Sequence, residues 1–228
     1  LTNGGSINDW ENRELNHIMA PLICIPTTAG TGSEVTFVAV INNTKGKYKM
    51  SIIDPERMAP NVALCDPELT LTLPPKLTAS TGMDALTHAV EAYTAKEHNS
   101  VSDALALYSI RMIFENVVRA YQSENLIHCR ENMMMASCIA GMAFINSNVG
   151  AVHALAETVG AHYHLPHGLL NAVFLPYIVE FNQDVCARRY QEILRCIGKD
   201  EKQHLATVVR DLNRLLSIPM LSSILSLS

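Results

Sequence analysis

Several features that assign a chain to a common functional class are missing from this sequence. Lysine and arginine number 17 against 22 acidic residues, and neither charge gathers into blocks. A chain with a net charge of −5 and no basic stripe is not expected to bind nucleic acid, and it offers no polybasic patch to a membrane surface. We therefore predict neither a nucleic-acid partner nor a membrane partner.

Paired cysteines are also missing. The six cysteines form no C-x-x-C motif and lie mostly in apolar runs, at positions 24, 65, 129, 138, 186 and 196. This distribution favours reduced core thiols over a disulfide framework or a structural zinc finger. Together with the lack of a basic segment and an apolar segment at residues 1–6, it predicts a cytoplasmic protein.

No clear membrane span can be identified. The longest stretch without Asp, Glu, Lys or Arg, residues 132–156, is long enough to cross a bilayer. However, three asparagines, two serines, a histidine and two glycines interrupt it. We interpret it as a buried core helix followed by a turn.

Hydrophobic residues make up 48% of the chain, enough for a substantial core, and their pattern changes near Pro74. Before it, short apolar runs predict strands at 22–25, 35–41, 48–53 and 62–65, with a hairpin turn at 42–46. After it, 3.6-residue periodicity predicts helices at 79–94, 102–121, 126–143, 150–161, 168–181, 185–197 and 201–216. The sequence thus predicts an α/β part over residues 1–73 and an all-helical part over 74–228.

A loop rich in threonine and glycine follows the first predicted strand. Residues 26–34 read Pro-Thr-Thr-Ala-Gly-Thr-Gly-Ser-Glu. Such a loop can bring backbone N–H groups and hydroxyls close to a ligand, because glycine lacks the Cβ that would block the approach. It matches neither the dinucleotide fingerprint nor a phosphate loop, so a plain structural turn stays an open alternative.

Asp84 and His88 are candidates for half of a metal site. On a helix, residues four apart share a face, so one element would deliver a carboxylate and an imidazole to a common point. A hydrogen-bonded surface pair is the alternative. His153 lies in an apolar setting where an unpaired imidazole would be costly, and a metal would supply its partner.

The fourth ligand cannot be chosen from spacing alone. His162, His164 and His167 all fall within one turn-rich segment. One carboxylate and three imidazoles would suit Fe²⁺ or Zn²⁺ and are too rich in nitrogen for Mg²⁺ or Ca²⁺.

Three of these segments together resemble the iron-containing (group III) alcohol dehydrogenase family. The matching stretches are Ile25–Thr36, Thr81–Tyr93, and Val152–Ala156 running to Leu165–Gly168. They occur in the right order, and the similarity extends over nearly the whole chain. The resemblance implies a dehydroquinate synthase-like architecture, with an N-terminal α/β dinucleotide-binding domain, a C-terminal all-helical metal-binding domain, and an active site in the cleft between them.

The resemblance also implies which residues form the site. The four metal ligands, for Fe²⁺ or Zn²⁺, fall on Asp84, His88, His153 and His167. The residues that match the family's NAD or NADP site are Thr27, Thr28, Thr31, Lys49 and Leu69. The implied reaction is reversible oxidation of a small alcohol to an aldehyde or ketone by a homo-oligomeric enzyme. A metal-dependent hydrolase could use the same ligands, but it has no need of a nicotinamide-binding loop.

Two departures from the family pattern qualify this reading. Many members carry a histidine four residues after His153, where this chain has Glu157. We predict that Glu157 lies near the site as a proton acceptor, as a partner of His153 or as a cap on a neighbouring group. The family's upstream phosphate-binding turn and final helices have no counterpart here. We therefore expect an internal piece of the enzyme, with a catalytically inactive metal-binding or interaction module as the alternative function.

Overall fold

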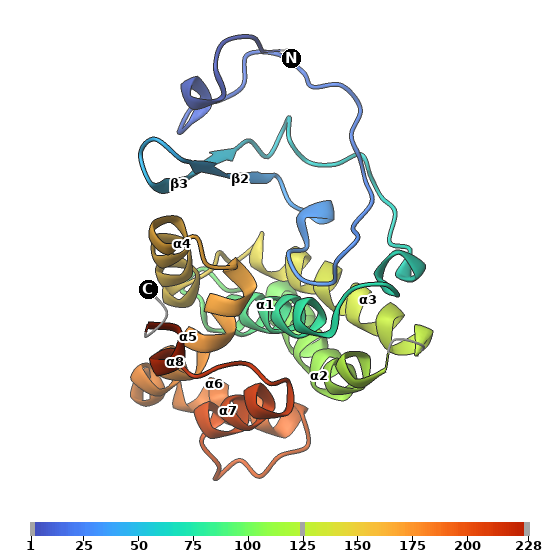
Figure 1. The fold of residues 1–228 in the computed structure, drawn as a ribbon, viewed down its shortest axis with the longest axis vertical. Helices are drawn as coiled ribbons and strands as arrows, with labels where there is room; N and C mark the ends of the chain where they lie inside the picture. The colour runs from blue at the N-terminus through green and yellow to red at the C-terminus, as the bar shows by residue number, and fades with distance from the viewer. Residues whose placement is uncertain (1–2, 124–125, 226–228) are drawn as a thin grey trace.

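A bundle of helices and a smaller, strand-containing part make up the fold (Figure 1). The computed structural model describes residues 3–123 and 126–225. Its strands are β1 (Ile23–Cys24), β2 (Val38–Asn43), β3 (Tyr48–Ile53) and β4 (Val62–Ala63). Its α-helices are α1 (Pro75–Thr94), α2 (Ser100–Gln122), α3 (Ile127–Phe144), α4 (Ala151–Tyr163), α5 (His167–Phe181), α6 (Gln183–Cys196), α7 (Leu205–Leu215) and α8 (Leu221–Leu225). This order confirms an α/β part followed by a helical part.

The four strands form two separate pairs. β2 and β3 are antiparallel, with Val38 opposite Ile53 and Asn43 opposite Tyr48, so the predicted hairpin is confirmed. β1 and β4 pair in parallel through only two residues each. Figure 1 shows the β2–β3 hairpin on the side of the bundle where α4 lies, and α4 packs against β3.

Three short 3₁₀ helices were not expected from the sequence, and one of them corrects a predicted strand. They span Ile7–Trp10, Ser33–Val35 and Pro67–Thr70. Val35 belongs to the second of these, and β2 begins only at Val38. The reason is tertiary: Gly32 has a left-handed backbone, with φ of +60°, and packs against α3. This contact turns the chain where the β-branched residues alone favour extension.

The helical prediction holds for all seven segments, but two starts are displaced by four residues: α1 begins at Pro75 instead of 79, and α7 begins at Leu205 instead of 201. The helix expected from residue 201 begins at Leu205, because Asp200 starts a turn instead. Its carboxylate accepts a hydrogen bond from the Lys202 N–H at 3.0 Å, and its carbonyl accepts one from the Gln203 N–H at 3.0 Å. Such local bonds compete with helix formation at aspartate. The short helix α8 was not predicted.

Helix α1 forms the centre of the bundle. Residues 78–93 are buried almost throughout, since α2, α3 and α5 pack around it. A helix buried on all sides needs small residues where its neighbours approach, and α1 supplies Ala79, Ala85, Ala89 and Ala92. Polar side chains on α1 are therefore also taken out of water.

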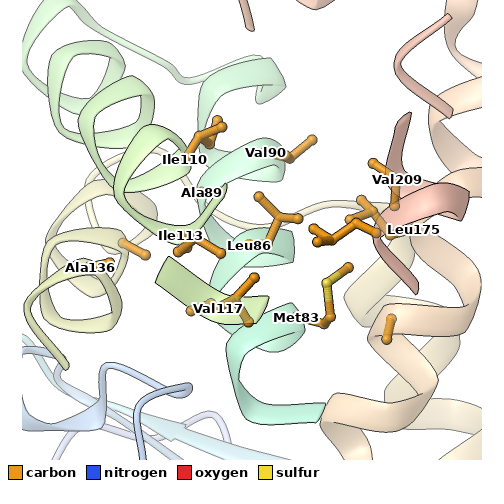
Figure 2. Close-up of a cluster of buried hydrophobic side chains, with 14 of the residues drawn as sticks. Met83, Leu86, Ala89, Val90, Ile110, Ile113, Val117, Ala136, Leu175 and Val209 are labelled. Atoms are coloured by element: carbon orange, nitrogen blue, oxygen red, sulfur yellow. The ribbon is translucent and has the colours of Figure 1, made fainter. Parts of the chain in front are cut away.

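The core joins α1 to helices that are distant in sequence. Figure 2 shows Leu86 and Val90 of α1 in the middle of the cluster, with Ile110 and Ile113 of α2 on one side and Leu175 of α5 on the other. Close packing on both sides fixes the rotation of α1 about its axis. That rotation decides which of its polar residues meet α4 and α5.

None of the helices in residues 3–123 and 126–225 is both long and apolar enough to cross a membrane. The long uncharged stretch is divided between α3 and α4, as the interpretation of a core helix and a turn requires. Pro74 precedes the first residue of α1 and Pro166 precedes that of α5, so both prolines mark helix boundaries. The division into two domains at residue 74 stays a prediction.

Candidate metal centre

Three helices bring the predicted ligands to one place. Asp84 and His88 project from the buried centre of α1, His153 from the first turn of α4, and His167 from the first residue of α5. Each of these residues apart from His167 is at least nine-tenths buried. A carboxylate and imidazoles gathered in an apolar core need partners for their polar atoms.

Asp84, His153 and His167 form a tight cluster. One ligand atom from each lies within 4.8 Å of the others. Asp84 Oδ1 is 3.9 Å from His153 Nε2 and 3.7 Å from His167 Nε2. These separations are too long for hydrogen bonds, whereas two ligands at ~2.1 Å from one tetrahedral cation lie ~3.4 Å apart. The spacing therefore fits atoms that share a cation.

His88 lies beside this cluster, but it is not among the residues whose ligand atoms all lie within 4.8 Å of one another. Its ring stacks on that of His153 with centroids 4.3 Å apart, and on that of Phe144 with centroids 4.4 Å apart. Its Nδ1 is buried and has no hydrogen-bond partner. Three of the four predicted ligands are thus brought together, and the fourth packs against one of them.

Glu91 holds His153 in place, a role that the sequence reading missed. Its carboxylate accepts hydrogen bonds from His153 Nδ1 at 2.6 Å, from Gly150 N at 2.8 Å and from Val152 N at 2.7 Å. The Nδ1 proton directs the His153 Nε2 lone pair toward Asp84, as second-shell carboxylates do in metal sites. A sequence signal existed: Asp84, His88 and Glu91 are related as i, i+4 and i+7 on one helix face.

His167 reaches Asp84 because α5 begins against α1. A Cβ on Gly168 would lie 2.5 Å from the Ser80 carbonyl oxygen, so only glycine permits this approach. The Asn171 amide nitrogen donates to Asp84 Oδ1 at 2.6 Å and lies 3.1 Å from His167 Nε2. The Asn171 amide group thus lies between Asp84 Oδ1 and His167 Nε2 and offers an N–H group to each. A cation bound to both atoms would also interact with their lone pairs.

The competing histidines are placed elsewhere. His162 and His164 are both exposed, and His164 ends α4 in a left-handed conformation with φ of 55°. Within the described residues, only His167 of these three joins the cluster with Asp84. This placement supports the predicted ligand set, which remains a prediction.

A divalent cation fits the polar atoms of this cluster. His153 Nε2, which faces Asp84, is buried without a hydrogen-bond partner. His88 Nδ1 and His167 Nδ1 beside it are also buried and unpaired. Buried polar groups of this kind are rare unless a ligand or water completes them. A mixed carboxylate and imidazole set is also what Fe²⁺ or Zn²⁺ requires.

The electrostatics keep the imidazoles available as ligands. Burial, reinforced by neighbouring histidines, lowers the pKa of His88 to about 3, and burial lowers that of His167 to about 4. Burial opposes ionisation of Asp84, but the surrounding imidazoles and Asn171 still bring its pKa below the usual value. At neutral pH His88 and His167 are therefore neutral imidazoles and Asp84 is a carboxylate, the protonation states that bind metals.

The residues expected at the cofactor lie on the surface of the strand-containing part. Thr27, Thr31 and Leu69 are exposed, while Thr28 and Lys49 are half-buried. Lys49 on β3 lies near enough to His167 for its charge to contribute to the lowered pKa of that histidine. The cofactor role of all five residues stays a prediction. Of these five, Lys49 is the one whose charge acts on a residue of the ligand cluster.

Glu157 is not joined to His153 by a hydrogen bond or an ion pair. It is half-buried on α4, and no hydrogen bond or ion pair is recorded for its carboxylate among residues 3–123 and 126–225. The hydrogen bond of His153 Nδ1 is accepted by Glu91 instead. Residue 91 reaches residue 153 through tertiary packing, which spacing along α4 cannot reveal. A role of Glu157 in proton transfer stays a prediction.

Comparison with known families agrees with the geometry of the cluster. The profile of the iron-containing alcohol dehydrogenases matches residues 1–67, and that of the C-terminal part of the same family matches residues 78–222. The chain belongs to the iron-containing alcohol dehydrogenase family. The candidate ligands from α1, α4 and α5 all lie in the segment matched by the C-terminal profile.

Relatives of this family member include named dehydrogenases. Alcohol dehydrogenase 4 of Saccharomyces cerevisiae is 44% identical over 96% of this chain, and the aligned part is 58% of the yeast protein. The NADPH-dependent butanol dehydrogenase of Clostridium saccharobutylicum is 42% identical over 88% of the chain and 52% of its own length. The chain therefore spans between half and three-fifths of these relatives.

Solved structures of the family have the same fold. An alcohol dehydrogenase from Oenococcus oeni superposes with a TM-score of 0.91 at 36% identity, covering 96% of this chain and 59% of the other. A sulfoacetaldehyde reductase from Bifidobacterium kashiwanohense, in complex with NAD⁺, gives a TM-score of 0.88 at 36% identity, covering 96% and 58%. The family architecture predicted from the sequence is thereby confirmed.

Proposed function

We propose that this chain is part of an NAD(P)-dependent alcohol dehydrogenase that interconverts a small alcohol with its aldehyde or ketone. The proposed metal ligands are Asp84, His88, His153 and His167, and the proposed metal is Fe²⁺ or Zn²⁺. The observation that carries the proposal is that Asp84, His153 and His167 each bring one ligand atom within 4.8 Å of the others, while His153 Nε2 is buried without a hydrogen-bond partner. We also propose a homo-oligomer, as the resemblance implies.

The substrate and nucleotide are proposed from chemistry and from relatives. Relatives with related sequences are named for butanol, methanol and 1,3-propanediol, so a short alcohol is the first choice. One of these names specifies NADPH and another NAD, so both nucleotides belong in the assay. Thr27, Thr28, Thr31, Lys49 and Leu69 are the proposed cofactor contacts.

The residues of this chain have distinct tasks in the proposed reaction. Asp84 supplies the negative charge of the ligand set, and Glu91 keeps the proton on His153 Nδ1 so that Nε2 faces inward. Phe144, stacked on His88, covers one side of the cluster with an apolar ring. Burial of this kind excludes water and strengthens the electrostatic interactions inside the site.

The bound groups would supply chemistry that these side chains lack. The cation would polarise the substrate oxygen as a Lewis acid, and the nicotinamide would exchange hydride with the substrate carbon. Glu157 is the proposed acceptor of the proton that the alcohol loses. Lys49, through its positive charge near His167, is placed to disfavour protonation of that ligand.

The test is reduction of short aldehydes by the purified, metal-loaded chain. Fe²⁺ under anaerobic conditions, or Zn²⁺, should support oxidation of NADH or NADPH with propanal or butanal, and the reverse reaction should occur with the alcohol. His153→Ala should abolish turnover. His162→Ala is the matched control, because His162 is exposed on the same helix and should have no effect.

A metal-binding module without dehydrogenase activity is the second candidate. It is favoured by one fact, that the chain spans only about 58% of the yeast relative. Metal bound stoichiometrically by the wild-type chain but not by His153→Ala, with no turnover under any nucleotide, would support this candidate and reject the dehydrogenase for this chain. Turnover that is lost in His153→Ala and retained in His162→Ala would reject the inactive metal-binding module.

A further inference from the structure

A second cluster of metal-binding side chains lies outside the site described above. Glu34 on the 3₁₀ helix Ser33–Val35, Cys65 after β4 and Cys138 on α3 place one carboxylate oxygen and two sulfur atoms within 4.8 Å of one another. Glu34 is 3% exposed and Cys138 is 4% exposed, while Cys65 is half-buried. These three residues come from segments that contribute no ligand to the Asp84 cluster.

Close backbone packing creates the second cluster. A Cβ on Gly32 would lie 2.7 Å from Gly141 Cα, and a Cβ on Gly141 would lie 2.8 Å from the Gly32 carbonyl oxygen. The loop is therefore pressed against α3 at a point one helical turn after Cys138. This contact carries Glu34, two residues after Gly32, into the interior beside the Cys138 thiol.

The buried Glu34 carboxylate has no basic partner among residues 3–123 and 126–225. None of the groups that shift its pKa is cationic: burial raises the pKa, and hydrogen bonds from the backbone and from Cys138 lower it in part. Burial also raises the pKa of Cys138 to about 12 and that of Cys65 above its ordinary value. Each group alone resists ionisation, so a positive charge is what this pocket of acidic groups lacks.

We propose that Glu34, Cys65 and Cys138 bind a thiophilic divalent cation, Zn²⁺ being the natural example and Co²⁺ and Cd²⁺ its probes. Two thiolates neutralise the cation, and the carboxylate provides a third ligand. Binding would release the thiol protons. The ion would link the loop that follows Thr31, the segment after β4, and α3. The site stands independently of the proposed dehydrogenase activity.

A disulfide between Cys65 and Cys138 is the competing chemistry for the same pair. Forming it requires a thiolate as nucleophile, an oxidant such as a peroxide to accept two electrons, and loss of both thiol protons. The burial that raises both pKa values leaves little thiolate at neutral pH and gives no partner to Glu34. A metal ion accounts for all three residues, whereas a disulfide accounts for two.

Co²⁺ spectroscopy distinguishes the new site from the Asp84 cluster. Sulfur ligands give Co²⁺ a charge-transfer band in the near ultraviolet, and the Asp84 cluster contains no sulfur. The reduced, chelator-treated chain should bind two equivalents of Co²⁺ and show this band. Cys65→Ser/Cys138→Ser should bind one equivalent and lose the band, while Asp84→Asn/His153→Ala should bind one and keep it.

Further variants test the carboxylate and the specificity of the signal. Glu34→Gln should keep both sulfurs but need more Co²⁺ for half-saturation of the band. Cys186→Ser is the matched control, because this half-buried cysteine lies on α6 away from the cluster, and the band should be unchanged. Circular dichroism and the metal-free melting temperature establish that each variant folds. If the double cysteine variant does not fold, the single Cys65→Ser variant serves.

Three results would overturn the proposal. The first is a wild-type chain that binds Co²⁺ without a sulfur band. The second is a band that survives intact in the folded cysteine variant. The third is a Cys65–Cys138 disulfide, found by mass spectrometry, in protein purified without reductant and without metal. None of these results depends on turnover, so they bear on this site and leave the proposed dehydrogenase activity untouched.

Discussion

At the scale of single residues, the most informative group is a carboxylate outside the predicted ligand set. Glu91 accepts hydrogen bonds from one side-chain and two backbone donors; those from His153 and Val152 are buried, and that from Gly150 is partly buried. It therefore joins the start of α4 to α1 and sets the orientation of the His153 ring. A carboxylate that serves both purposes should affect metal binding without touching the metal.

Glu91→Gln should weaken metal affinity by about 10- to 100-fold, the range typical of second-shell changes. Glutamine keeps one acceptor oxygen, but its NH₂ group cannot accept from His153 or from the two backbone N–H donors. Competition with a chelator of known affinity measures the effect. Glu157→Gln is the matched control on α4, and its metal affinity should equal that of the wild type although its turnover should fall. Unchanged affinity in Glu91→Gln would contradict the role assigned to Glu91.

Asp54 anchors the N-terminal segment in a similar way. Its carboxylate accepts from Leu15 N at 3.1 Å, from Arg57 N at 2.9 Å and from the Arg57 guanidinium at 3.2 Å. Desolvation opposes its ionisation, but these hydrogen bonds and the Arg57 charge lower its pKa below the ordinary value for aspartate. The folded state therefore stabilises the ionised form of Asp54 more than the unfolded state does.

The lowered pKa gives a pH dependence with a definite sign. The contribution of Asp54 to stability is present above the ordinary aspartate pKa and is lost as the pH falls through the lower folded-state pKa. Asp54→Asn should therefore destabilise the N-terminal segment at pH 7, and the difference from wild type should shrink in acid below pH ~4. Hydrogen exchange of the Leu15 amide measures it, with Glu56→Gln, an exposed neighbour, as control. An equal difference at both pH values would contradict the assignment.

Residue patterns predicted the candidate ligands better than their surroundings. Asp84 and His88 were suggested by helical spacing, and the resemblance chose His167 over His162 and His164. The partners Glu91 and Asn171 were missed, because they act on residues 62 and 87 positions away in the sequence. A single sequence contains no direct signal for such contacts, although the position of Glu91 on the Asp84 face was readable.

At the scale of elements, the packing of the threonine-glycine loop on α3 decides local structure. Residues 33–35 contain a β-branched valine, yet they form a 3₁₀ turn because Gly32 and Gly141 bring two backbones into contact. Helices were predicted more accurately than this loop, since amphipathic periodicity runs through a whole helix. A loop determined by one tertiary contact has no such pattern to follow.

Two glycine substitutions separate backbone strain from steric clash. Gly32 and Gly198 both have left-handed backbones, with φ of +60° and +69°, but an added Cβ meets Gly141 Cα at 2.7 Å only in the first case. Gly198→Ala should cost about 1–2 kcal/mol, the strain of a left-handed residue. Gly32→Ala should cost about 1–3 kcal/mol more, because the loop and α3 must separate.

Urea unfolding of both variants, with equal slopes, measures the difference in free energy. A further readout for Gly32→Ala is the position of Glu34, because separation of the loop from α3 should also weaken the sulfur band of bound Co²⁺. Equal losses of stability in Gly32→Ala and Gly198→Ala would mean that the loop moves freely away from α3. That result would contradict the close packing from which the second metal cluster was inferred.

At the scale of the whole molecule, the two parts of the chain differ in how well they are buried. The helical part encloses one continuous core around α1 (Figure 2). In the strand-containing part, Ile23, Ile25, Val62 and Leu64 on or beside β1 and β4 are all at least 46% exposed. The overall α/β-then-helical order was predictable from the change of hydrophobic period at Pro74. The small extent of the sheets was not, because strand pairing depends on partners distant in sequence.

The Asp84 cluster joins α1, α4 and α5, so a metal ion bound there should stabilise the helical part as a unit. A ligand at 100 times its dissociation constant stabilises the folded state by about 2.7 kcal/mol. For a chain of this size, 1 kcal/mol corresponds to about 2–4 °C in melting temperature, so the metal should raise it by about 5–11 °C. Differential scanning calorimetry of chelated and metal-loaded protein measures the shift.

Three controls assign this shift to the Asp84 cluster. Asp84→Asn should abolish it, because the variant lacks the only carboxylate in the ligand set. Cys65→Ser/Cys138→Ser should retain it with Fe²⁺, since the nitrogen-rich cluster is intact and the sulfur ligands are not involved. Mg²⁺ should give no shift, because it prefers oxygen ligands in octahedral geometry. A shift that persists in Asp84→Asn would place the stabilising ion elsewhere and remove the main support for the proposed catalytic metal.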